Sequence, residues 1–352
     1  MIKKYILLAL VVLAASCETK KAEDKTVKEP QEITLYTHRH YDSDKLIFGK
    51  FEKATGIKVN VVKASADELI QKMQSEGKQS PADLLLTVDA GRLVRAKAKG
   101  LLQSVNSEVL ATTVPAHLTD TDKQWFSLTK RARVVVYDKE KVQPEELSTY
   151  AALSDPKWKG ELLIRASSNI YNQSLMASII ANDGAENAKK WATELVQNFA
   201  RTPKGNDRDQ VKAILAGEGK LAVINTYYLG KLLHSQDENE IAAGNAVSVF
   251  FPNQEGRGTH VNVSGIGVAK YAPHKENAVK FIEYLVSKEV QEIFADANYE
   301  YPVNKEAKAS ELLNSWGTFK EDNLPLSKLG ELNKAAVILF DEVKWDKGAV
   351  AK

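Results

Sequence analysis

Leu221-Ala222-Val223-Ile224-Asn225-Thr226-Tyr227-Tyr228-Leu229-Gly230 joins a short apolar run to two adjacent tyrosines. The apolar run is typical of a buried strand. On a strand, the two neighbouring side chains would point to opposite faces, and on a helix they would lie about 100° apart. Both tyrosines can therefore point into the same region only if the chain turns at this place. A turn after the strand would direct both phenol oxygens to one point. An isolated pair is also compatible with one packed ring and one partly exposed ring.

The chain before this stretch alternates strand-like and helix-like segments, which is the pattern of an α/β fold. The first predicted segments are strand, helix, strand, helix and strand, at Ile33 to Tyr36, Asp44 to Thr55, Ile57 to Val62, Asp67 to Ser75 and Ala82 to Thr87. A further helix to Gly100 would complete a doubly wound half by Leu101.

A second α/β half follows an extended crossover, in which Thr129 to Arg131 interrupts two extended pieces, Trp125 to Leu128 and Arg133 to Tyr137. Further strands are predicted at Leu162 to Arg165, Val247 to Phe251 and Val261 to Val268. Further helices are predicted at Asn172 to Ala181, Asn187 to Phe199, Gln210 to Ala216, Ala278 to Val286, Val290 to Asp296 and Leu332 to Val343. The length of 352 residues suits two such lobes.

Residues 1–16 have the pattern of a secretory signal, with Lys3 and Lys4 before an apolar run and small residues. Cys17 is the single cysteine of the sequence, and Leu13-Ala14-Ala15-Ser16-Cys17 resembles the lipobox of bacterial lipoproteins. We therefore expect Cys17 to carry a lipid; the alternative is a plain signal with an incidental cysteine. Residues 17–31 are rich in Lys, Glu and Thr and predict a flexible tether.

The composition argues against several kinds of partner. The formal charge is +2, and loss of Lys3 and Lys4 with the signal brings it close to zero, which disfavours nucleic acid. Beyond the signal, no apolar stretch of the sequence approaches membrane length, so the lipid at Cys17 would be the membrane contact. We expect a monomer. The nucleophile, phosphate-loop and dinucleotide motifs of common enzymes are missing, so no enzyme activity is predicted.

Several motifs along the mature chain resemble those of the periplasmic iron-binding proteins of ABC importers, the ferric-binding protein family, and most closely its anion-independent branch. These motifs are Arg39-His40-Tyr41, Leu128-Thr129-Lys130-Arg131-Ala132-Arg133, Asp155-Pro156-Lys157-Trp158-Lys159-Gly160, Asn225-Thr226-Tyr227-Tyr228 and Arg257-Gly258-Thr259-His260-Val261-Asn262. The tyrosine pair with an upstream His-Tyr is the more specific part, whereas Asp-Pro-x-Trp-x-Gly is common among related binding proteins.

The resemblance implies a type II periplasmic binding protein fold with a hinge between two lobes. Lobe 1 would comprise residues 32–132 and 250–305, and lobe 2 residues 133–249 and 306–345. The resemblance also implies a lipid-anchored protein of the periplasm that captures ferric iron between the lobes and delivers the iron to an ABC transporter permease. The alternative is a binding protein of the same fold for an organic solute, such as a polyamine or a carboxylate.

By motif, the resemblance assigns the metal ligands to His40, Tyr41, Tyr171, Tyr227 and Tyr228. The chemistry agrees, because ferric iron is a hard cation that prefers anionic oxygen, while a soft metal would favour cysteine. Four phenolates against three positive charges leave about one negative charge, which a nearby arginine could offset. Arg131 is the first choice for this role, and Arg39 and Arg165 are the others. His38 lies two residues from His40, so the sequence alone leaves His38 open as the ligand.

Overall fold

The computed structural model describes residues 31–39 and 41–348. Its strands form a sheet in the order β2-β1-β3-β8-β4-β6-β5, and β7 and β9 each pair with β4. The strands are β1 (Glu32–Thr37), β2 (Lys58–Lys63), β3 (Leu84–Val88), β4 (Phe126–Asp138), β5 (Leu162–Leu163), β6 (Leu221–Asn225), β7 (Val247–Phe250), β8 (Val261–Val268) and β9 (Tyr301–Pro302). The predicted α/β class with mixed strand directions is confirmed.

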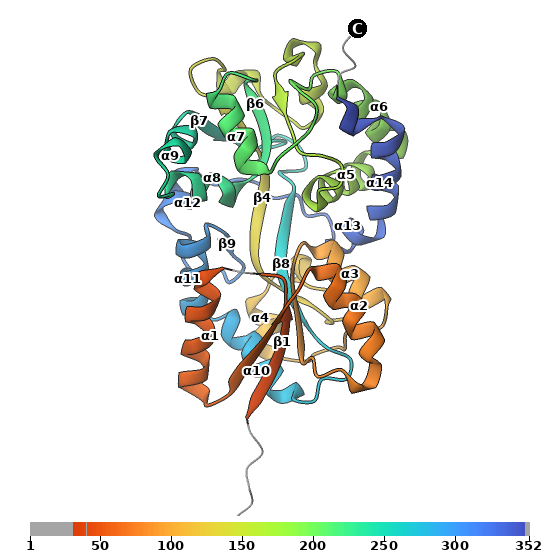
Figure 1. The fold of residues 1–352 in the computed structure, drawn as a ribbon, viewed down its shortest axis with the longest axis vertical. Coiled ribbons are helices and arrows are strands. Elements are labelled where there is room, and N and C mark those ends of the chain that lie inside the picture. Colours follow the sequence, from red (N-terminus) through yellow and green to blue (C-terminus); the bar gives the residue numbers. More distant parts are fainter. Residues whose placement is uncertain (1–30, 40, 349–352) are drawn as a thin grey trace, which may run out of the picture. The chain divides into compact units, whose positions relative to one another are not determined.

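Helices separate most of the strands along the chain (Figure 1). They are α1 (Asp42–Thr55), α2 (Ala66–Glu76), α3 (Ala90–Ala98), α4 (Glu108–Thr113), α5 (Ile170–Asp183), α6 (Ala185–Val196), α7 (Asp207–Leu215), α8 (Thr226–Leu233), α9 (Glu238–Asn245), α10 (Lys275–Leu285), α11 (Lys288–Asn298), α12 (Glu311–Ser315), α13 (Ser327–Glu331) and α14 (Asn333–Glu342). Within the described ranges, none of these helices has the length and apolar character needed to cross a bilayer.

The first lobe is built on β1, β2, β3 and β8. β1 pairs in parallel with both β2 and β3. Parallel neighbours need crossover connections, which α1 and α2 supply. β8 then returns antiparallel to β3. The predicted doubly wound half is therefore confirmed.

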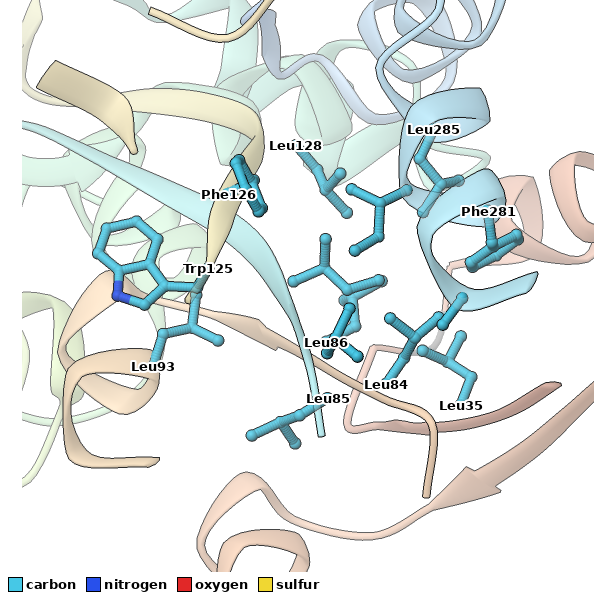
Figure 2. Close-up of a cluster of buried hydrophobic side chains, with 14 of the residues drawn as sticks. Leu35, Leu84, Leu85, Leu86, Leu93, Trp125, Phe126, Leu128, Phe281 and Leu285 are labelled. Carbon is cyan, nitrogen blue, oxygen red and sulfur yellow. The ribbon is translucent and has the colours of Figure 1, made fainter. Parts of the chain in front are cut away.

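A large buried cluster holds this lobe together. Figure 2 shows Leu84 and Leu85, which are neighbours on β3, pointing to opposite faces of the strand, as strand geometry requires. On one face, Leu84 and Leu35 gather with Phe281 of α10, and all three are fully buried. Because both faces of β3 are covered, its sequence is a continuous apolar run rather than an alternating one.

β4 belongs to both lobes. Its first part pairs with β8, with a shift of register between Ser127 and Thr129. Its second part pairs antiparallel with β6 and β7. The predicted interruption at Thr129 to Arg131 is wrong, since one strand runs through this segment. The irregularity falls slightly earlier, as a local bulge that disturbs the ladder without ending the strand.

The second lobe has a core on each face of its sheet. Val135 of β4 belongs to a cluster that includes Leu175 of α5, while Val134 belongs to a cluster that includes Leu232 of α8. Successive strand residues point to opposite faces, so the sheet is covered by helices on both sides. The predicted strand from Leu162 to Arg165 is shorter than expected and ends at Leu163.

The C-terminal helices contribute to both lobes. Leu326 and Leu329 join the core of the first lobe, whereas Leu339 and Phe340 join a core of the second. The chain from Gln31 onward clusters as one compact unit. The boundaries at 32–132 plus 250–305 and at 133–249 plus 306–345 therefore stay a prediction. Residues 1–16, Cys17 and the tether up to residue 30 lie outside the described residues, as does His40.

Candidate metal-binding site

Four of the predicted ligands line one cavity. Tyr41, Tyr171, Tyr227 and Tyr228 surround a space of about 350 Å³. The other lining residues are His38, Arg39, Val88, Asn206, Arg208 and Lys231. Tyr41 comes from the first lobe and the other three tyrosines come from the second. The cavity thus lies where the two lobes meet.

Each tyrosine stands at the start of a helix. Tyr41 immediately precedes α1 and follows β1 closely, and Tyr171 is the second residue of α5. The Asn169 side chain caps α5 and accepts a hydrogen bond from the Tyr171 backbone N–H at 3.2 Å. A helix N-terminus carries a partial positive charge, so each of these positions favours an anionic oxygen.

The tyrosine pair begins α8 directly after β6, where a turn was predicted. The two rings lie with their centroids 4.3 Å apart and their planes tilted by 34°. Tyr227 is 3% exposed, and Tyr228 is half-buried. The burial of the pair matches the packing alternative, but both side chains also line the cavity. Packing and ligand binding are therefore compatible here.

The phenol oxygens approach one another. Tyr227 Oη donates a hydrogen bond to Tyr171 Oη at 3.1 Å. Burial raises the pKa of Tyr41 and of Tyr227 well above the usual value of 10.0, and for Tyr227 the neighbouring tyrosines raise the pKa further. Burial also raises the pKa of Tyr228. Without a cation, these three side chains are neutral phenols at neutral pH.

The three predicted arginines all lie near the tyrosine rings. Arg39 lines the cavity, and its guanidinium carbon lies 4.8 Å from the centre of the Tyr41 ring. The guanidinium carbons of Arg131 and Arg165 each lie 5.8 Å from the centre of the Tyr171 ring. All three are positioned to offset negative charge on the phenol oxygens.

Each arginine also has a carboxylate neighbour. Arg39 forms a salt bridge with Asp44 at 2.9 Å, and Arg165 forms one with Asp207 at 2.6 Å. Arg131 is 3.9 Å from Glu300, and both side chains are 1% exposed. The Nε and Nη2 atoms of Arg131 are buried and make no hydrogen bond within the described part of the chain. Of the three arginines, Arg131 lies farthest from its carboxylate neighbour, so its charge is the least directly paired.

Lys231 is a cavity residue that the sequence reasoning missed. Its ammonium nitrogen lies 4.3 Å from the centre of the Tyr41 ring and 5.4 Å from that of Tyr227. Burial lowers its pKa, while the carboxylate of Glu300 acts in the opposite direction. A helix prediction over this segment would have revealed it, because residues four apart share one helix face.

Two histidines remain to be placed. His38 lines the cavity, and its Nε2 atom lies 3.2 Å from a guanidinium nitrogen of Arg92. His40 falls at a position that the structure does not describe. The choice between them as a ligand stays a prediction. Among the described residues, no group of three or more His, Cys, Asp or Glu side chains is arranged to hold a metal ion.

Comparison with known proteins places the chain in a family. Residues 47–321 match the family described as bacterial extracellular solute-binding proteins. The chain belongs to that family. It is 53% identical to iron uptake protein A1 of Synechocystis over 320 residues, covering 91% of this chain and 89% of the relative. It is 29% identical over 278 residues to the major ferric iron-binding protein of a Neisseria meningitidis strain, covering 78% of this chain and 81% of the relative.

Solved structures agree with this placement. A Trichodesmium protein, described as IdiA or FutA in complex with iron and citrate ligands, matches with a TM-score of 0.87 and 51% identity, covering 89% of this chain and 99% of that one. The ferric binding protein of Campylobacter jejuni matches with a TM-score of 0.84 and 45% identity, covering 88% and 99% of the two chains. The resemblance drawn from the motifs and the type II two-lobed fold are both confirmed.

Proposed function

We propose that this protein captures ferric iron between its lobes through Tyr41, Tyr171, Tyr227, Tyr228 and His40. The observation that carries the proposal is the convergence of four phenols on one cavity, from helix starts that lie far apart in the chain. A structural role would not require four phenol side chains to share so small a space. The relatives named for iron uptake or ferric iron binding support the same cargo.

The donor set suits ferric iron. Four phenolates supply hard anionic oxygen, and a neutral imidazole completes a five-ligand shell. The bound cation drives the phenols to ionise although burial disfavours their charged form. The excess negative charge of this shell is offset by cations near the tyrosine rings, namely Arg39, Arg131, Arg165 and Lys231.

The second lobe brings three of the phenols and takes up iron first. The first lobe then contributes Tyr41 and His40 as the lobes close about β4 and β8. A closed, loaded form presents a surface that the open form lacks, and an ABC transporter permease recognises it. Lipidation at Cys17 and the tether keep the carrier near the membrane in the periplasm. The family's description as extracellular solute-binding proteins supports this location.

Metal analysis with a visible spectrum tests the proposal. Protein purified without its leader and loaded with ferric iron should show a broad charge-transfer band and about one iron per chain. Tyr227→Phe and Tyr228→Phe should each weaken or shift the band. Tyr271→Phe is the matched control, because Tyr271 is 46% exposed and lies outside the cavity lining.

Colourless protein without bound iron would overturn the proposal. Binding of a polyamine or carboxylate with no dependence on metal would support an organic solute instead. An unchanged spectrum in both tyrosine variants would show that the iron lies elsewhere.

A further inference from the structure

Tyr299 has an unusual backbone conformation. It follows the last residue of α11 with φ 58° and ψ 35°, in the left-handed region. Bulky L-residues avoid this region because the side chain crowds the following carbonyl. Such a conformation persists when surrounding contacts hold it, and it often marks a functional position.

The contact that holds Tyr299 crosses from one lobe to the other. α11 packs into the core of the first lobe through Val290 and Phe294, whereas α8 packs into a core of the second. The base of the Tyr299 ring lies against Gly230 of α8, where an added Cβ would stand 2.4 Å from Tyr299 Cγ. Any other residue at position 230 would push the ring away.

His234 completes the seat for this ring. It directly follows the last residue of α8, four residues after Gly230, and its imidazole stacks on Tyr299 with centroids 4.9 Å apart and planes tilted by 22°. The His234 ring nitrogen Nδ1 lies 3.0 Å from the Gly230 carbonyl oxygen, which fixes the imidazole on the helix. Gly230 and His234 therefore form a notch that fits one aromatic ring.

The notch stands between the ligands of the two lobes. Gly230 follows the tyrosine pair by two residues on the same helix. On the other side, the Ser43 hydroxyl donates a hydrogen bond to the Asn298 side-chain oxygen at 2.9 Å. Ser43 follows Tyr41 by two residues, and Asn298 precedes Tyr299. Two contacts, linked by short stretches of backbone, thus join Tyr41 to the tyrosine pair through Tyr299.

We infer that Tyr299 is a positioning residue for iron capture. When the lobes close, its ring seats in the notch of Gly230 and His234 and sets the separation between Tyr41 and the tyrosine pair. Metal shells require their ligands within about 0.5 Å of the productive geometry, so this seat determines whether the shell is complete. The inference rests on the proposed function, because it names the contact that limits how far the lobes close around the iron.

Gly230→Ala tests this role without touching a ligand. Alanine favours a helix more than glycine does, so α8 itself should stay folded, but the new methyl group collides with Tyr299. We expect circular dichroism and thermal unfolding close to wild type. Closure of the lobes around iron should make the wild-type molecule more compact, which small-angle scattering measures. In Gly230→Ala this iron-dependent compaction should be smaller, and ferric affinity should fall by about tenfold or more. The charge-transfer band should persist, because the three second-lobe tyrosines remain.

Gly49→Ala is the matched control. Gly49 also lies within a helix, and an added Cβ there meets nothing within 4 Å. This variant should bind iron and compact as the wild type does. The double variant Gly230→Ala with Tyr299→Gly removes the collision and relaxes the backbone at position 299. It should regain iron-dependent compaction, because no ring holds the lobes apart, but its ferric affinity should stay below that of the wild type, because the ring that positions the ligands is gone.

Three outcomes would count against the inference. If Gly230→Ala compacts and binds iron like the wild type, Tyr299 does not set the closed geometry. If the double variant does not regain compaction, the collision is not the cause of the loss, and if it binds iron as tightly as the wild type, the Tyr299 ring does not position the ligands. A wild type that takes up no iron overturns the proposed function itself, and the positioning role with it.

Discussion

The ammonium nitrogen of Lys231 lies 4.3 Å from the centre of the Tyr41 ring, although the two residues belong to different lobes. Lys231 also faces Tyr227, so one cation contacts a predicted ligand on each side of the cavity. A ring over a cation is attracted to it even as a neutral phenol, and the attraction grows once the phenol ionises. Lys231 is therefore placed to stabilise the loaded shell more than the metal-free one.

Lys231→Met should weaken ferric binding. Methionine preserves most of the apolar stem and removes the charge, and the lost attraction in a partly buried site is about 1 to 3 kcal/mol. Competition with a coloured iron chelator would measure the change in affinity. Lys53→Met is the control, because Lys53 is exposed on α1 and outside the cavity lining. Equal affinities for the two variants would contradict a role for the Lys231 charge.

Acid should release the iron. Burial raises the pKa of Tyr41, Tyr227 and Tyr228, so these phenols hold their protons without metal and must lose them on binding. Protons and iron then compete for the same oxygens, and affinity falls as pH decreases. Titration of the charge-transfer band from about pH 8 to about pH 5 would follow the loss, which should be steeper than one proton per iron. Affinity that stays flat over this range would argue against a phenolate shell.

Some of this site was predictable because it lies at strand ends. β1 is an alternating, strand-like stretch and β6 is an apolar run, and the residues that follow each strand include Tyr41 and Tyr227. In an α/β sheet, ligands gather beyond the carboxyl ends of strands, so these positions were natural candidates. The helix start at Tyr171 was predicted within two residues, since α5 begins at Ile170.

Other parts of the site were not predictable from local sequence. Glu300 reaches Arg131 from a distant part of the chain, beside a strand of only two residues, β9. So short a strand has no periodicity to detect. Lys231 was missed because the tyrosine pair was predicted as a turn, and a turn gives no reason to place the fourth residue on the same face. The packing of the Tyr299 ring against Gly230 was likewise not predictable, because it is a contact between residues of different lobes.

His260 should make the fold sensitive to acid. Its side chain is 4% exposed, and burial together with Arg133 and Arg131 lowers its pKa to about 3 from 6.5. The unfolded chain binds a proton at pH values where the folded one does not, so this stability contribution is present above about pH 6.5 and is lost as pH falls toward 3. His260 therefore adds up to about 1.4 kcal/mol per pH unit to the slope of the free energy of unfolding against pH.

His260→Asn should remove that slope. The free energy of unfolding, measured by urea titration of the metal-free protein between about pH 7 and pH 4, should depend less on pH in the variant than in the wild type. His117→Asn is the control, because it removes an exposed histidine. If the two variants show the same pH dependence as the wild type, the buried imidazole does not contribute as expected.

Ser174→Ala should loosen a further contact between the lobes. Asp89 caps α3 of the first lobe with φ 81°, and its buried carboxylate accepts a hydrogen bond from the Ser174 hydroxyl of α5 at 2.6 Å. Asn262 on β8 donates to the same carboxylate oxygen at 2.8 Å. Ser174 follows Tyr171 by three residues on α5, so this bond holds the helix of a predicted ligand against the first lobe. Hydrogen bonds to a charged group contribute about 1.5 to 3 kcal/mol.

Because the Ser174 bond spans the lobes, its loss should lower the population of the closed form and reduce ferric affinity by about tenfold or more. Ser178→Ala provides a close control: Ser178 is equally buried on α5, but its hydroxyl donates to the Leu175 carbonyl oxygen within the same helix. Both variants should lose some thermal stability, whereas only Ser174→Ala should lose iron-dependent compaction in small-angle scattering. If Ser178→Ala loses as much compaction, the effect arises from a weakened α5. If neither variant does, the bond between Asp89 and Ser174 does not contribute to closure.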